Sequence, residues 1–269
     1  MAVTVINKVN FQDAVNRNSY VTGTWTATNN LGYIADVATS GTITTCTAMV
    51  DTTGLTWVTV TNTAAFNTSF RVTRFRAMVA SGATSGTTTA NLGTSVSRGT
   101  IVISEVSGMD TTGTNGSGMY VQDASATLAT ATVSLKVSLP SAITAGNATL
   151  GIIYGNTTGT DAMDPKQGDS EISQGGPGTE NGLNQTEWNA TAHVTGQWSA
   201  GSFLWGGIYT ELKLVAAGGA AVGFGALLGF VRNVMVIPFL GTQRRGIFVR
   251  SPIEFLWRTR IITFAGDDE

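Results

Sequence analysis

The chain has 269 residues, of which 42% are hydrophobic and 12% are charged. The charged share is about half the roughly 25% of an ordinary globular protein. A net charge of −2 argues against a strongly basic nucleic-acid-binding protein, so no nucleic acid is expected as a partner. The single cysteine, Cys46, excludes an internal disulfide and with it a small disulfide-stapled scaffold. The N-terminal residues lack a charged start followed by an apolar run, so no secretory signal is expected.

Eight short segments before residue 214 are predicted as β-strands, because each is apolar or alternating and is bounded by Gly, Asn, Asp or Ser. They are residues 33–38, 56–61, 70–80, 100–106, 131–139, 148–154, 192–198 and 205–212. The many β-branched Thr residues favour strands, and the many Gly residues favour tight turns. The spacing predicts an all-β fold, an antiparallel β-sandwich of jelly-roll type that spans residues 1–213.

Charged residues mark two unusual segments of this predicted sandwich. Arg74 and Arg76 alternate with apolar residues in segment 70–80, which predicts a strand covered on one face only. Residues 155–188 are predicted to form a long loop. Four acidic residues lie in it: Asp161, Asp164, Asp169 and Glu171. Their spacing does not match an EF-hand, so a solvated loop is favoured over a calcium site.

The composition changes at residue 214. Residues 214–231 carry no charge, and the six basic residues of 214–269 are all arginine. Residues 1–213 carry 9 basic and 13 acidic side chains, a net charge of −4, whereas residues 214–269 carry 6 and 4, a net charge of +2. We therefore predict two parts: a β-sandwich domain, 1–213, and an apolar, then Arg-rich C-terminal arm, 214–269.

Two structures are open for residues 214–231. Eighteen uncharged residues are long enough for a transmembrane helix, and the spacing of Gly219 with Gly223 fits close helix packing. Large residues also alternate with glycine, which favours an extended arm packed on a neighbouring protein. The arm is the preferred interpretation, although the membrane helix is not excluded. The residues expected at its interface are Val222, Phe224, Leu228, Phe230, Arg244, Arg245, Arg250, Phe255, Trp257, Arg258 and Arg260.

Residues that could carry catalysis are few and scattered. The only histidine, His193, lies in an alternating segment, Cys46 has no evident partner, and no Gly-x-Ser-x-Gly motif is present. A pair of carboxylates could hydrolyse glycosidic bonds. Candidates by residue type are Glu105, Asp110, Glu187 and Glu211. The sequence does not bring any two of them together, so no enzyme activity, metal or cofactor is expected.

Several short motifs occur in an order that resembles a known module. They are GLTW at 54–57, TRFRA at 73–77, ISEVSGMDT at 103–111, GNATLG at 146–151, TEW at 186–188 and WGGIYTELK at 205–213. Over residues 20–213 the chain resembles a β-sandwich module that recurs in phage and prophage structural proteins and in some bacterial surface proteins. Those modules close on a similar strand. The resemblance implies a virion or surface role and no catalytic residue.

These observations lead to an expected function. The chain is expected to be a structural protein of a bacteriophage virion, a capsid decoration (cement) protein or a tail- or fibre-associated protein. Its partners would be copies of itself and other virion proteins. One alternative is a carbohydrate- or host-receptor-binding surface protein that uses Trp188 or Trp198. Another is a membrane-anchored surface protein with its span at 214–231, and a third is a depolymerase.

Overall fold

The computed structural model describes residues 3–42, 44–66, 69–155, 163–165, 170–175, 183–189, 193–198, 204–215, 247–249 and 260–262. The chain divides into two units, Met1–Ala216 and Ala217–Glu269. In the second unit the described residues form one antiparallel pair, β19 (Ile247–Val249) with β20 (Arg260–Ile262). The fold is all-β and antiparallel: apart from one short 3-10 turn, η1 (Ser117–Met119), the described elements are strands. The prediction of an all-β antiparallel sandwich is confirmed.

The first half of unit Met1–Ala216 is a sandwich of two sheets, which we call the first repeat. Its inner sheet has the order β1-β10-β4-β7-β6, and its outer sheet has the order β2-β9-β5. The inner strands are β1 (Thr4–Asp13), β4 (Gly32–Ser40), β6 (Val58–Asn62), β7 (Arg71–Met78) and β10 (Arg98–Ser107). The outer strands are β2 (Arg17–Val21), β5 (Cys46–Asp51) and β9 (Thr88–Val96). A separate two-stranded sheet is formed by β3 (Trp25–Thr26), which follows β2 in the chain, and β8 (Ser85–Gly86), which precedes β9.

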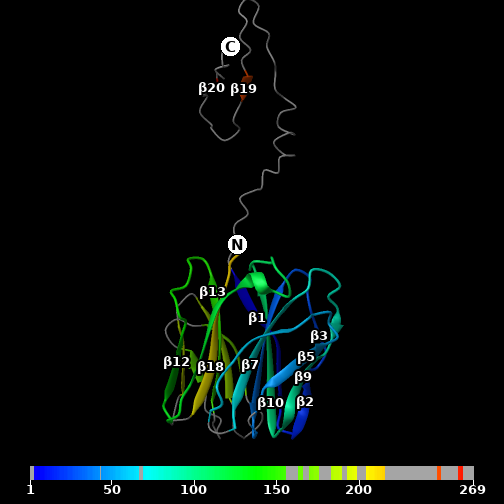
Figure 1. Cartoon of the computed structure of the whole chain (residues 1–269), viewed down its shortest axis with the longest axis vertical. Helices are drawn as coiled ribbons and strands as arrows, with labels where there is room; N and C mark the ends of the chain where they lie inside the picture. Colours follow the sequence, from blue (N-terminus) through cyan, green and yellow to red (C-terminus); the bar gives the residue numbers. More distant parts are fainter. Residues whose placement is uncertain are drawn as a thin grey trace, which may run out of the picture. The chain divides into compact units, whose positions relative to one another are not determined.

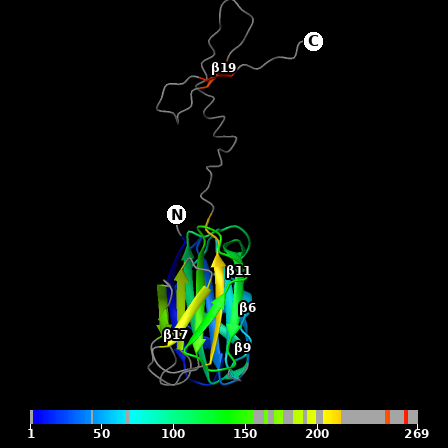
Figure 2. The ribbon, with the colours of Figure 1, turned by 90° about the vertical axis from the view of Figure 1, so that its left-hand side faces the viewer.

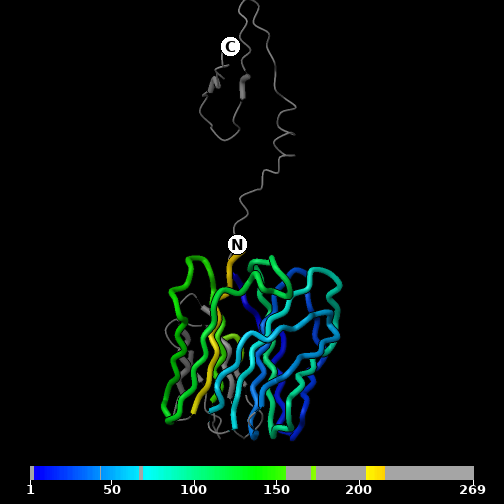
Figure 3. Tube along the Cα trace, viewed as in Figure 1, coloured from blue at the N-terminus to red at the C-terminus, as the bar shows by residue number. Residues whose placement is uncertain are grey.

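The second half, the second repeat, has the same arrangement. Its inner sheet has the order β11-β18-β13-β16-β15, and its outer sheet has the order β12-β17-β14. The inner strands are β11 (Tyr120–Thr127), β13 (Ala148–Gly155), β15 (Ser170–Gly175), β16 (Leu183–Asn189) and β18 (Trp205–Leu212). The outer strands are β12 (Ser134–Ser138), β14 (Met163–Pro165) and β17 (His193–Trp198). Figure 3 traces both repeats along the chain.

Strand order and register show that the two repeats are copies of one topology. Without the β3–β8 pair, each repeat has eight strands, with an inner order of 1-8-3-6-5 and an outer order of 2-7-4. Both also carry a β-bulge at the same place: the register shifts between Thr59 and Thr61 in β6, and between Glu171 and Ser173 in β15. Such a bulge is a specific feature of a strand pair. The order is compatible with the predicted jelly-roll type, which stays a prediction.

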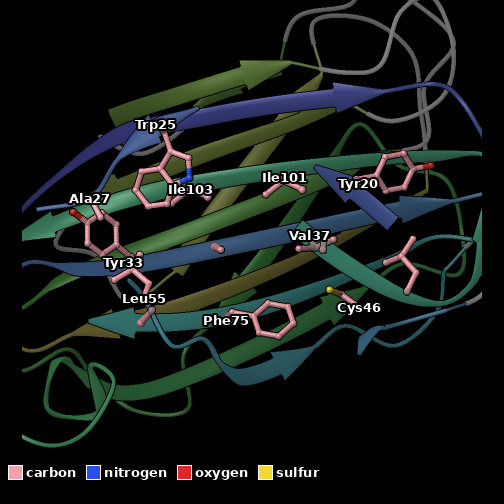
Figure 4. Packing of buried hydrophobic residues seen from close by; sticks show 14 of the residues in the cluster. Tyr20, Trp25, Ala27, Tyr33, Val37, Cys46, Leu55, Phe75, Ile101 and Ile103 are labelled. Carbon is pink, nitrogen blue, oxygen red and sulfur yellow. The ribbon is translucent and has the colours of Figure 1, made fainter. Parts of the chain in front are cut away.

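The four sheets stack with the two inner sheets at the centre (Figures 1 and 2). One core lies between the inner and outer sheets of the first repeat and includes Tyr33, Phe75 and Ile101 (Figure 4). Another lies between the sheets of the second repeat and includes Leu135 and Tyr209. Two further cores join the inner sheets to each other. Because an inner sheet is covered on both faces, β4, β13 and β18 are buried along their whole length, while β12 alternates.

The inner sheets pack about a pseudo-two-fold axis that runs along the strands. Glu105 pairs with Tyr33 in the first repeat and Glu211 with Thr149 in the second, which makes β4 and β13 equivalent. By this register Ile34 is equivalent to Leu150, and these two share one core. Ala38 is likewise equivalent to Tyr154, and they share the next core. The contact of β1 with β15 is matched by that of β11 with β6.

The observed strands also correct two expectations. All eight predicted segments contain a strand, but the residues predicted as the loop 155–188 include β14, β15 and most of β16. Strand β7 is covered on both faces, and Arg74 is fully buried, because the second repeat lies over the face that was expected to be open.

Candidate functional site

Among the described residues, the contact between the two inner sheets contains the buried ion pair of Arg74 with Asp36. Arg74 of β7 donates two parallel hydrogen bonds to the carboxylate of Asp36 on β4, from Nε at 2.7 Å and from Nη2 at 2.8 Å. Both side chains are essentially inaccessible to solvent. The Nη1 atom of Arg74 crosses to the second repeat, where it donates to the Leu150 carbonyl and the Thr210 hydroxyl, each at 2.8 Å. Charged groups buried so deeply are tolerated when they are paired and hydrogen-bonded, as here.

A second buried carboxylate lies near the C-terminal end of β18, the last strand of the second repeat. Glu211 on β18 accepts hydrogen bonds from Gln122 Nε2, Asn147 Nδ2 and the Thr144 backbone N–H, at 2.6, 2.6 and 2.8 Å. Burial raises the pKa of Glu211, but these hydrogen bonds outweigh it and hold the pKa below its ordinary value. Asn147 in turn accepts from the Leu214 backbone N–H. This network joins two of the sequence motifs, GNATLG and WGGIYTELK.

The equivalent carboxylate of the first repeat, Glu105, has different partners. It accepts a hydrogen bond of 2.7 Å from the Tyr33 hydroxyl and forms an ion pair with Lys8 on β1 at 3.4 Å. Desolvation, followed by the bond to Glu105, raises the pKa of Tyr33 to about 12, so this phenol is a fixed donor at neutral pH. The same strand position therefore holds a structural carboxylate in both repeats.

The segment that follows β10 and the segment that follows β18 pair with each other. Met109 pairs with Leu214 in an antiparallel bridge, and the Asp110 N–H donates to the Lys213 carbonyl. The Asp110 carboxylate also pairs with the Lys213 ammonium at 2.8 Å. The hydrogen bonds from Lys213 and Thr112 hold the pKa of Asp110 at about 2.

The carboxylates considered for glycosidic hydrolysis do not assemble into one groove among the described residues. Glu105 shares the face of β10 that packs on the outer sheet of the first repeat, and Glu211 shares the face of β18 that packs on the outer sheet of the second. Both inner sheets lie between them, and stacked sheets are about 10 Å apart. Asp110 is paired with Lys213. Only the backbone of Glu187, in β16, is described.

The two residues considered for nucleophilic chemistry lie on strands. Cys46 is a buried residue at the start of β5, in the core of the first repeat (Figure 4). Its burial raises the pKa of the thiol to about 12, which removes the thiolate that a nucleophile needs. His193 begins β17, where its backbone pairs with Ser138.

Most residues of the predicted interface lie outside the described residues. This holds for Val222, Phe224, Leu228, Phe230, Arg244, Arg245, Arg250, Phe255, Trp257 and Arg258, and also for Asp161 and Asp169 of the acidic segment. Arg260 is described as the first residue of β20. The two tryptophans considered for sugar binding are placed through their strands: Trp188 pairs with Leu150 and Ser170, and Trp198 with Met163.

Within the described residues, no group of three or more His, Cys, Asp or Glu side chains could hold a metal ion. No described helix has the length and apolar character of a membrane span.

The Asp36–Arg74 pair is the feature that the sequence did not reveal. Each residue does give a local signal, because Asp36 interrupts the apolar segment 33–38 and Arg74 alternates with Val72 and Arg76. A lone charge in a strand buried on both faces requires a partner. The partner lies on another strand, and Leu150 and Thr210 lie in the other repeat, so spacing alone could not identify them.

Comparisons with protein-family models, with curated proteins and with solved structures found no match.

Proposed function

We propose that this chain is a non-enzymatic structural protein of a bacteriophage virion, located in the particle as a capsid decoration protein or as a tail- or fibre-associated protein. It assembles with copies of itself and with other virion proteins, and its C-terminal arm makes the contact. The motif resemblance over residues 20–213 supports the virion, and the arrangement of the first unit supports the role of the arm.

The observation that carries the proposal is that the first unit already covers its own cores. Each inner sheet packs on its own outer sheet and on the other inner sheet, which buries the central strands β4, β13 and β18 on both faces. The described chain of this unit ends in paired residues at Leu214 and Val215. Residues 217–231 are uncharged and include Val222, Phe224 and Leu228. The cores of the first unit are formed without these residues, and an apolar segment of this composition suits a contact with another protein.

Charge gives the arm a second means of contact. The six arginines of residues 214–269 are opposite in sign to the net charge of residues 1–213, which is −4. Arginine suits carboxylates at interfaces because its planar fork donates two parallel hydrogen bonds. An arm that buries apolar side chains and pairs its arginines with carboxylates of a neighbouring copy fits a protein of repeating assemblies.

The test is to locate the protein in bacteria that carry its gene after particle production is induced. Particles are purified by density gradient, and the protein is quantified by mass spectrometry in particles, membranes and culture fluid. We expect it in the particles in many copies. Recovery in the membrane fraction would support the membrane-anchored alternative, and absence from the particles would refute the proposal.

A further inference from the structure

The Asp36–Arg74 pair occurs once, although the strands that hold it occur twice. In the second repeat the register position of Asp36 is taken by Ile152, and that of Arg74 is taken by Thr186, which pairs with Ile152. Unlike the ion pair, the groups that accept hydrogen bonds from Arg74 across the interface have equivalents in both repeats. Leu150 is equivalent to Ile34, and Thr210 is equivalent to Ser104, which also carries a hydroxyl.

From this asymmetry we infer that the pair selects the partner of the inner sheet. It directs the inner face of the first repeat to the second repeat and prevents it from binding the first repeat of a second copy of this chain. The discriminating residues are Asp36 and Arg74 on one side and Ile152 on the other. This inference does not depend on the proposed function.

The pseudo-two-fold axis explains why the pair discriminates. Residues near the axis share a core with their own equivalents: Ile34 with Leu150, and Ala38 with Tyr154. Asp36 lies between Ile34 and Ala38, so it is opposite Ile152. If two first repeats packed in this way, Asp36 would be opposite a second Asp36, and two ion pairs would be buried side by side. Desolvating a second ion pair costs several kcal/mol, and the like charges oppose each other.

The selection matters because the two repeats share one strand order, so their inner sheets are similar in shape. An inner sheet without charge could pack on any other inner sheet, including one from another chain, and repeats exchange partners readily when their faces are alike. With one such buried pair per chain, the pairing within the chain is the arrangement in which Asp36 meets Ile152 and not a second Asp36. Specificity of this kind commonly depends on making the wrong pairing costly.

The experiment moves the pair within the full-length chain. One variant transfers it, with Asp36→Ile and Arg74→Thr in the first repeat and Ile152→Asp and Thr186→Arg in the second. A second variant doubles it, with Ile152→Asp and Thr186→Arg alone. The doubled variant places inside one chain the charges that a pairing of two first repeats would bury. Urea denaturation followed by tryptophan fluorescence compares both with the wild type.

We expect the transferred variant to keep a denaturation midpoint close to that of the wild type, because its new arginine meets Ile34 and Ser104, the equivalents of Leu150 and Thr210. The doubled variant should lose more than about tenfold in its ratio of folded to unfolded protein, or fail to fold. A doubled variant as stable as the transferred one would overturn the inference. Failure of the transferred variant to fold would also overturn it, because the two sites would not be equivalent.

Discussion

Among single residues, Arg74 donates hydrogen bonds to groups of both repeats. Its removal would leave Asp36 as a buried, unpaired carboxylate. We predict that Arg74→Ala lowers the free energy of unfolding by about 3–5 kcal/mol, the usual cost of breaking a buried pair. The matched control is Arg17→Ala, which breaks the surface pair of Arg17 with Asp13. An exposed pair contributes only about 0–1 kcal/mol. Equal losses for the two variants in urea denaturation would show that the inter-repeat pair does not have this role.

Glu211 should make the stability of the first unit sensitive to acid. Its folded pKa lies below the ordinary value of 4.5, so its contribution is fully present above that pH and is lost as the pH falls through the folded pKa. We predict a smaller acid-induced loss of stability for Glu211→Gln than for the wild type, measured by urea denaturation between neutral pH and pH 3. The pKa of Asp110 is also lowered, but Asp110 is present in both proteins, so its effect on the pH profile cancels in the comparison. Identical pH profiles would contradict the prediction.

Cys46 offers a direct test of the first-repeat core. Its thiol is buried and its pKa is raised to about 12, so almost no thiolate exists at pH 8. We predict that the folded protein reacts with an aromatic disulfide reagent far more slowly than the protein in urea, as followed by absorbance. Equal rates in the two states would place Cys46 outside the core.

The two glycines of the WGG motif in β18 show how an element is shaped by its neighbours. A Cβ at Gly206 would overlap the ring of Phe66, which belongs to the first repeat, and a Cβ at Gly207 would lie 3.0 Å from both the Ile152 carbonyl oxygen and Val137. We predict that Gly206→Ala costs about 1–3 kcal/mol of stability through overpacking. Gly23→Ala is the control, because nothing lies within 4 Å of that position. Equal melting temperatures for the two variants would contradict the contact with Phe66.

The elements that sequence patterns predicted include the strands with the strongest apolar content. Strands β4, β10, β13 and β18 belong to inner sheets and are buried on both faces, so their sequences are nearly continuous in apolar residues. Strands β9, β15 and β16 were not predicted, because they are rich in Thr, Ser, Asn, Gln and Glu and resemble loops. Their backbone pairing is set by their neighbours in the sheet, which a local pattern does not contain.

At the scale of the whole molecule, the duplication could not be predicted from the sequence. The repeats share strand order, a bulge position and the buried carboxylates Glu105 and Glu211, but few other residues. Equivalent positions hold different residues, as Asp36 of the first repeat corresponds to Ile152 of the second. The predicted single sandwich of 1–213 is thus two sandwiches packed through their inner sheets, in one unit that extends to Ala216.

The central claim is that the C-terminal arm joins a complete folded unit to a particle. The most direct measurement is the particle occupancy of a chain that ends at Ala216, because Leu214 and Val215 belong to the first unit. The truncated and full-length chains are expressed at equal levels, and the copies per purified particle are counted by quantitative mass spectrometry. The account predicts that the truncated chain is folded by circular dichroism and is absent from particles. Wild-type occupancy of the folded, truncated chain would contradict it.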